Sequence, residues 1–161
     1  RPGHFKGMAQ VVKRLLDLVL PNDLYMGQKD FQQFTIVAHM IKTLKLPIRL
    51  VVSPIMREAH GLAMSSRNER LNADLRSRAA IIYKTLKTAK TKLKTMDVRE
   101  VEKWALKRME VPDFKPEYFS IVDGYTLKPV ENPELHDYIV ACTAIWAGEV
   151  RLIDNMIYKN R

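Results

Sequence analysis

The sequence has one cysteine, Cys142, among 161 residues. An internal disulfide is therefore excluded, and this usage fits a reducing compartment, so the cytoplasm is the expected location. No apolar run approaches the ~20 residues that a bilayer-spanning helix needs, and the N-terminus lacks the basic-then-apolar layout of a signal peptide. We expect a soluble globular protein with no membrane partner, in which Cys142 is a small buried apolar residue.

Acidic residues are also fewer than basic ones. The sequence has 18 Asp and Glu residues and 27 Lys and Arg residues, which gives a net charge of +9. The basic excess lies in residues 1–115, whereas residues 116–161 carry more acidic than basic side chains. A basic surface suits phosphate-bearing partners, either nucleotides or nucleic acid. One interpretation is therefore a nucleic-acid-binding module built on the helices of residues 69–115. The alternative is that the lysines form the solvated face of one helix: Lys84, Lys87, Lys90, Lys92 and Lys94.

The first third of the chain has the pattern of alternating helices and strands. Apolar residues recur at helical spacing over residues 8–19 and 31–44, and short apolar strands occupy residues 23–27 and 48–53. This order, with short connections, predicts an α/β fold with parallel strands. Both faces of a parallel sheet need cover and two strands are too few, so we expect the rest of the sheet to lie outside this sequence, which would then be a fragment.

The remainder of the chain has the pattern of helices followed by strands. Asn72 is the expected cap of one long helix that reaches residue 93, and Asp97 is the expected cap of a second helix over residues 98–109. Strand-like segments follow at residues 118–124, 138–148 and 149–158. We predict a small α+β unit with a short antiparallel sheet, and a division of the chain into residues 1–57 and 58–161.

A first polar cluster, MGQKDFQQ at residues 26–33, lies where a strand ends and a helix starts. Ligands of open α/β sheets bind beyond the carboxyl ends of strands, where helix N-termini offer free N–H groups to anions. Gly27 would let a ligand approach the backbone, Lys29 can pair with a phosphate, and Asp30 can accept hydrogen bonds from ribose hydroxyls. The alternative is that Asp30 and Gln33 simply form a capping box.

A second polar cluster, GLAMSSRNER at residues 61–70, precedes the next helical pattern. Serine and arginine donors beside a glycine can hold an anion, and the planar fork of arginine suits phosphate oxygens. A helix start is the alternative, because Ser66 and Glu69 also have capping-box spacing. A serine nucleophile is not expected, since no acidic residue is placed to orient His60. The four histidines show no metal-ligand spacing, so no metal site is expected.

Several segments together resemble the pantothenate synthetase (pantoate–β-alanine ligase) family in order and spacing. They are RPGHFKG (1–7), MGQKDFQQ (26–33), MREAHGLAMSSRN (56–68), DGYTLKPV (123–130) and RLIDN (151–155). The resemblance implies an ATP-dependent ligase in which ATP and pantoate form a pantoyl adenylate with release of pyrophosphate. β-Alanine then attacks the adenylate to give pantothenate and AMP. The resemblance also implies the end of a Rossmann-like nucleotide-binding domain, a small C-terminal lid domain, and a homodimer of the full-length enzyme.

The resemblance further implies a role for individual residues. Lys29 and Arg67 match catalytic positions, and Gln33 matches the glutamine that binds pantoate. Gln28 stands where the family usually has Glu. The ATP-binding positions fall on Gly27, Gln28, Lys29, Asp30, Met56, Met64, Ser65, Ser66 and Arg67. The family's His-x-Gly-His motif and the surroundings of its nucleotide-bound Mg²⁺ are absent from the sequence, so we expect the chain to be inactive alone.

Overall fold

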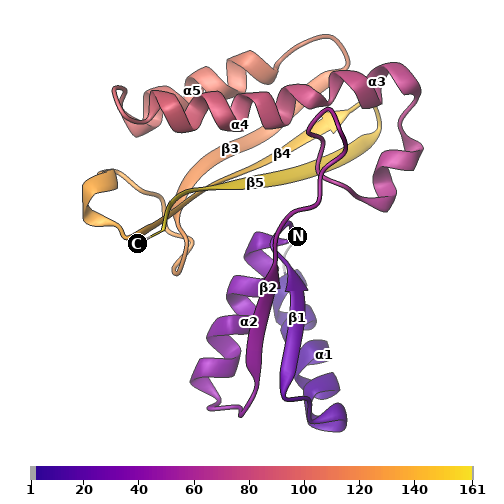
Figure 1. Cartoon of the computed structure of the whole chain (residues 1–161), viewed down its shortest axis with the longest axis vertical. Coiled ribbons are helices and arrows are strands. Elements are labelled where there is room, and N and C mark those ends of the chain that lie inside the picture. Colours follow the sequence, from indigo (N-terminus) through magenta and orange to yellow (C-terminus); the bar gives the residue numbers. More distant parts are fainter. Residues whose placement is uncertain (1–2, 161) are drawn as a thin grey trace. The chain divides into compact units, whose positions relative to one another are not determined.

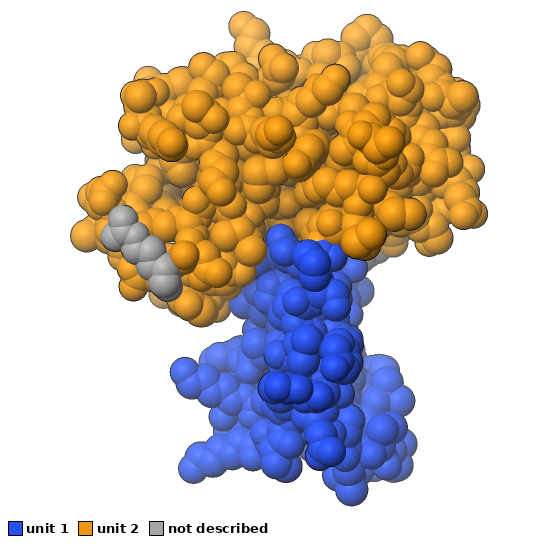
Figure 2. Space-filling view, viewed as in Figure 1, with its two compact units in different colours: residues 1–54 blue, residues 55–161 orange. Residues whose placement is uncertain are grey.

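The computed structural model describes residues 3–160, so Arg1 and Pro2 of the RPGHFKG segment lie outside the described residues, as does Arg161. The chain divides into two compact units, residues 1–54 (unit 1) and residues 55–161 (unit 2), which Figure 2 shows in different colours. The boundary between these compact units lies three residues before the boundary at residue 57 that the sequence predicts for the two domains. Within residues 3–160, none of the helices combines the length and apolar character that crossing a membrane requires.

Unit 1 is a pair of parallel strands with two helices (Figure 1). Its elements are α1 (His4–Val19), β1 (Asp23–Gly27), α2 (Phe31–Thr43) and β2 (Arg49–Ser53). The strands pair in parallel from Asp23 opposite Arg49 to Gly27 opposite Ser53. The expected α/β order with parallel strands is confirmed, although α1 begins earlier than the apolar spacing indicated.

The core of unit 1 is small and comes mainly from α2. The buried apolar residues of α2 are Phe31, Phe34, Val37 and Ile41. In α1, Leu16 is the one buried residue. Large apolar side chains remain exposed on α1 and just after it, namely Val11, Leu15, Leu18, Val19 and Leu20. Unit 1 therefore buries less apolar surface than its sequence offers.

Unit 2 combines helices with a three-stranded antiparallel sheet of order β3-β4-β5. Its helices are η1 (Ser66–Arg70), α3 (Ala73–Arg78), α4 (Ala80–Lys92), α5 (Val98–Met109) and η2 (Pro133–Leu135), of which η1 and η2 are 3₁₀ helices. Its strands are β3 (Phe114–Asp123), β4 (Tyr138–Ala147) and β5 (Val150–Asn160). Helices α4 and α5 run along one face of the sheet (Figure 1), and the buried core lies between these layers.

Two expectations about unit 2 are wrong in detail. The single helix expected between Asn72 and residue 93 is two helices, α3 and α4, which are separated at the buried residue Ala79. Strand β3 begins at Phe114, earlier than expected, and contains Pro116. The register shifts between Pro116 and Tyr118, and such a bulge accommodates a proline that cannot donate to the strand ladder.

Candidate functional site

The first group of candidate residues lies at the carboxyl end of the parallel strands of unit 1. Gly27 and Ser53 are the last residues of β1 and β2 and lie opposite each other. The Gln28 N–H donates to the Ser53 carbonyl at 2.8 Å, and the chain then enters α2 at Phe31. Residues 27–30 therefore connect a strand end to a helix N-terminus, where backbone N–H groups have no intrahelical partners.

Asp30 occupies the N-cap position of α2 without capping it through its side chain. Its backbone carbonyl accepts hydrogen bonds from the N–H groups of Gln33 at 2.9 Å and Phe34 at 3.2 Å. The capping box that Asp30 and Gln33 could have formed is not made, so that interpretation is wrong. The Asp30 carboxylate is exposed and can accept hydrogen bonds from a ligand.

Gly27 has open space beside it. A Cβ atom at this position would meet no heavy atom within 4 Å, and the residue does not have a positive φ angle. The described part of unit 1 thus gives no steric or conformational reason for a glycine. Close approach of a ligand to the backbone would supply one.

The second group of candidate residues lies in unit 2, in the segment 56–68. The Met64 N–H donates to the Met56 carbonyl at 2.9 Å, which places the two methionines side by side. Met56 is 69% exposed and Met64 is 54% exposed. Adjacent exposed methionines form an adaptable apolar surface that suits a flat ring.

Ser65, rather than Ser66, caps η1. The Ser65 Oγ accepts a hydrogen bond from the Arg67 N–H at 3.3 Å. The helix start at Ser66 is confirmed, because η1 begins there, but the capping residue is Ser65 and not Ser66. Ser66 and Arg67 are exposed, and their side chains make no hydrogen bond or ion pair with any of residues 3–160. A hydroxyl donor and a guanidinium are thus presented together, which is a suitable arrangement for a phosphate.

Sequence reasoning missed the residues that hold the segment 56–68 in place. Arg57 forms an ion pair with Asp154 of β5, and Glu58 binds both Asn68 and Arg76. The one sequence signal was a carboxylate, Asp154, within a predicted strand. Such a residue is rarely buried unless it is paired.

The DGYTLKPV segment has a structural explanation. Asp123 accepts hydrogen bonds from the Tyr125 and Thr126 N–H groups, and its other oxygen lies 2.9 Å from His136 Nδ1. Burial alone would raise the pKa of Asp123, but the hydrogen bonds from His136 and Thr126 hold it below its ordinary value. A Cβ atom at Gly124 would lie 2.3 Å from the Tyr138 ring, so glycine is needed there.

The lysines of α4 are partly engaged within unit 2. Lys90 Nζ donates to the Ile157 carbonyl at 2.9 Å. Lys87 Nζ lies 5.7 Å from the centre of the Tyr83 ring, and Lys92 Nζ lies 5.0 Å from that of Trp104. These contacts favour a solvated helix face over a nucleic-acid-binding stripe.

The described residues do not support a reactive cysteine or a metal site. Cys142 is buried, as expected, and burial raises the pKa of its thiol to about 12, so the thiol is unreactive near neutral pH. Among residues 3–160, no group of three or more His, Cys, Asp or Glu side chains could hold a metal ion.

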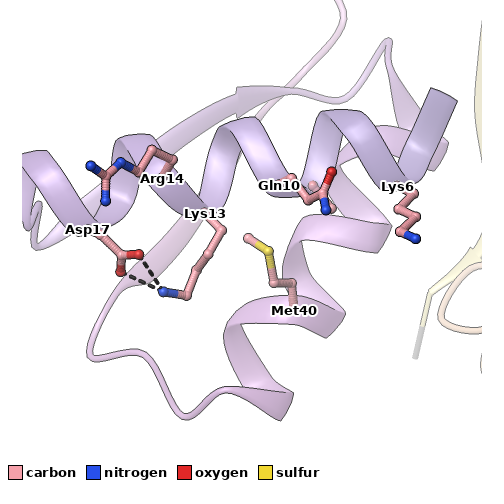
Figure 3. A pocket seen from close by; sticks show the side chains of 7 residues that line it. Lys6, Gln10, Lys13, Arg14, Asp17 and Met40 are labelled. Carbon is pink, nitrogen blue, oxygen red and sulfur yellow. Dashed lines mark hydrogen bonds and ion pairs between the residues drawn. The ribbon is translucent and has the colours of Figure 1, made fainter. Parts of the chain in front are cut away.

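A hollow of about 490 Å³ lies in unit 1, at some distance in sequence from the candidate residues (Figure 3). It is lined by Lys6, Ala9, Gln10, Lys13, Arg14 and Asp17 of α1 and by Met40 of α2. Lys13 and Asp17 form an ion pair at 2.6 Å across one turn of α1. None of the candidate residues lines this hollow.

The comparisons with known proteins agree on one family. The sequence profile of the family described as Pantoate-beta-alanine ligase matches residues 1–157. A pantothenate synthetase from Azobacteroides pseudotrichonymphae is 43% identical over 159 residues, which cover 98% of this chain and 57% of the relative. The chain thus spans little more than half the length of the curated relatives it matches.

Solved structures give the same result. The crystal structure of pantothenate synthetase from Thermus thermophilus superposes with a TM-score of 0.89 at 36% identity, covering 99% of this chain and 58% of the other. The pantoate-beta-alanine ligase from Francisella tularensis, complexed with beta-gamma ATP and beta-alanine, has a TM-score of 0.67 at 30% identity, covering 98% and 52%. The mixed fold, with a parallel pair of strands followed by an antiparallel sheet, is shared with these structures.

Proposed function

This chain belongs to the pantoate-beta-alanine ligase family, and on that premise we propose that it forms part of an ATP-dependent ligase that joins pantoate to β-alanine. ATP and pantoate would give pantoyl adenylate and pyrophosphate, and β-alanine would then displace AMP to give pantothenate. The observation that carries this proposal is the family match over residues 1–157, which includes both groups of candidate residues. The Francisella tularensis relative was solved with a form of ATP and with beta-alanine, which supports these substrates.

In the proposed arrangement, residues 1–57 are the end of a Rossmann-like ATP- and pantoate-binding domain, and residues 58–161 form a lid domain. The exposed apolar side chains of α1 support the first assignment, because a larger Rossmann-like sheet would cover them. Full-length members would form homodimers. Mg²⁺ would arrive with the nucleotide phosphates, and since the described residues offer no ligand cluster for it, its ligands would lie elsewhere.

Both groups would contact ATP. Gly27 would allow the nucleotide to approach the backbone, and Asp30 would accept hydrogen bonds from the ribose hydroxyls. Gln28 replaces the family's usual Glu, so only its backbone is assigned to the nucleotide. Met56 would contact the adenine, and Met64 would belong to the loop over the phosphates. The exposed Asp30 carboxylate and the adjacent methionines support these roles.

Adenylate formation brings a pantoate carboxylate against the negatively charged α-phosphate. Lys29 and Arg67 would offset the charge that grows in the transition state, which is the largest catalytic term in such reactions. Ser65 and Ser66 would donate hydrogen bonds to phosphate oxygens. Gln33 would hold pantoate beside the phosphate, so that attack becomes effectively intramolecular.

A chimera tests the proposal. This chain would replace the matching part of the Thermus thermophilus enzyme, with which it shares 36% identity, and AMP release would be measured with both pantoate and β-alanine present. We expect turnover by the chimera that requires both substrates, and none by the 161-residue chain alone. A chimera that folds, as judged by circular dichroism, but releases no AMP would contradict the proposal.

A further inference from the structure

The segment 56–64 of unit 2 folds back on itself as a narrow hairpin. The Glu58 N–H donates to the Leu62 carbonyl and the Met64 N–H donates to the Met56 carbonyl, each at 2.9 Å. The hairpin leads directly into the segment that carries Ser65, Ser66 and Arg67. Whatever fixes the hairpin therefore fixes where these phosphate-binding candidates begin.

Arg57 attaches the first strand of the hairpin to β5. Its Nη1 donates to Asp154 Oδ2 at 2.7 Å and to the Gly61 carbonyl at 3.0 Å. Its Nη2 donates to Asp154 Oδ1 at 3.0 Å and to the Asn155 carbonyl at 3.3 Å. The Asp154 side chain is only 2% exposed, and the guanidinium also stacks 4.1 Å from the centre of the Tyr83 ring. One side chain thus joins the hairpin, the sheet and α4.

Glu58 attaches the same hairpin to η1 and α3. Its Oε1 accepts a hydrogen bond from Asn68 Nδ2 at 2.8 Å, and its Oε2 accepts one from Arg76 Nε at 2.9 Å. Asn68 Nδ2 also donates to the Ala63 carbonyl at 3.0 Å. Asn68 is 1% exposed and immediately follows Arg67, so the end of the phosphate-binding segment is also held in place.

Gly61 closes the arrangement at the tip of the hairpin. Its φ angle is +102°, and a Cβ atom there would lie 2.4 Å from Tyr83 Cδ1. The backbone can contact the ring only because the side chain is absent. Three separate contacts therefore fix the segment 56–68 within unit 2.

We propose that Arg57 and Glu58 are positioning residues, which hold Met64–Arg67 in the conformation that binds phosphate before the nucleotide arrives. The buried Arg57–Asp154 pair is the main anchor, and Asn68 and Arg76 complete it through Glu58. The inference rests on the proposed function, since the segment is taken to bind ATP. Its value to the enzyme is that no binding energy is spent on ordering the segment.

Hydrogen exchange in the 161-residue chain tests the anchor directly. The double variant Arg57→Met/Asp154→Leu replaces a buried ion pair with apolar residues of similar size, a change that often leaves global stability intact. The reporters are the Glu58, Gly61 and Met64 amides, which close the hairpin. We expect exchange at these amides to accelerate at least ~10-fold through local opening, while the β4–β5 amides keep their protection. Wild-type protection at all three amides would overturn the proposal.

A second ion pair of the same sheet provides the matched control. Arg151 of β5 pairs with Glu117 of β3 at 2.7 Å, but the side chains are 31% and 43% exposed. Exposed pairs contribute little, so Glu117→Leu/Arg151→Met should change exchange in the hairpin by less than ~2-fold. If the first double variant does not fold, Arg57→Lys is used instead, because lysine keeps the positive charge but lacks the planar guanidinium that donates to both Asp154 oxygens. This variant should still accelerate hydrogen exchange at the hairpin amides ~3-fold or more.

Adenylate formation in the chimera shows whether the position of the segment Met64–Arg67 affects the reaction. The Arg57→Met/Asp154→Leu chimera should have a KM for ATP raised ~10-fold or more, a readout that a purely stabilising role would not move in a folded protein. An unchanged KM alongside accelerated exchange would overturn the positioning role. An inactive parent chimera would instead refute the proposed function, while the exchange result would still decide whether the anchor exists.

Discussion

Gly61→Ala should destabilise unit 2 strongly for two reasons. At φ +102° an alanine is strained, which costs on the order of 1–3 kcal/mol. The new Cβ would also lie 2.4 Å from Cδ1 and 3.2 Å from Cγ of Tyr83. These atoms belong to a ring that Arg57 covers at 4.1 Å, so the ring must move and weaken that contact, at a further cost of about 1–2 kcal/mol. We therefore expect the free energy of unfolding to fall by about 2–5 kcal/mol.

The assay can isolate unit 2, because both tryptophans of the chain, Trp104 and Trp146, belong to it. Urea unfolding followed by tryptophan fluorescence gives the free energy directly. Gly148→Ala is the matched control. Gly148 also has a positive φ, +55°, but its added Cβ would lie 3.4 Å from the nearest atom, so only the strain of about 1–2 kcal/mol applies.

A double-mutant cycle separates the clash from the backbone strain. Removing the ring with Tyr83→Ala should make the Gly61→Ala substitution less destabilising by at least ~1 kcal/mol, because the two residues are in contact. Equal losses of stability for Gly61→Ala and Gly148→Ala, with additivity in the Tyr83→Ala background, would refute the account of a hairpin pressed against α4.

Two further outcomes follow from the ionisable groups. Hydrogen bonds from Arg76 hold the pKa of Glu58 below its ordinary value. At pH values above the unfolded-state pKa of about 4.3, the ionised carboxylate therefore stabilises unit 2. This stabilisation is lost as the pH falls through the lower folded-state pKa. Urea unfolding between pH 6 and pH 3 should show a smaller loss of stability for Glu58→Gln than for the wild type, and identical slopes would contradict this assignment. The buried Cys142 thiol, with a pKa raised to about 12, should react with a colourimetric disulfide reagent at pH 8 only after denaturation, and rapid labelling of the folded chain would show that it is accessible.

The order of the elements could be predicted because local patterns determine it. Apolar residues at helical spacing, bounded by Pro21 and Pro47, delimit α1 and α2, and Gly148 marks the turn between β4 and β5. The break between α3 and α4 could not be predicted in this way, because the helical spacing continues across Ala79. The early start of β3 was hidden by Pro116, which is unusual in a strand and needs a bulge.

The candidate site was predictable only in part. The strand-to-helix position of residues 27–30 follows from the pattern of the first unit, but the roles of Lys29 and Arg67 came from the family resemblance. The anchor of the hairpin had no local signal, since Arg57 and Asp154 are 97 positions apart. An ion pair of that kind depends on the sheet bringing distant segments together. The failure of Asp30 to cap α2 likewise depends on side-chain geometry that a capping-box spacing cannot decide.

The most direct test of the central claim is single-turnover formation of pantoyl adenylate by the chimera, measured as pyrophosphate release without β-alanine. Lys29→Ala and Arg67→Ala should each slow this step by more than ~10²-fold, the scale for losing one preorganised charge donor. The matched controls are Lys42→Ala on α2 and Arg70→Ala on η1, two exposed cations of the same units, which should stay within ~3-fold of the parent. Near-parental rates for Lys29→Ala or Arg67→Ala would contradict the assignment of these residues to the phosphates.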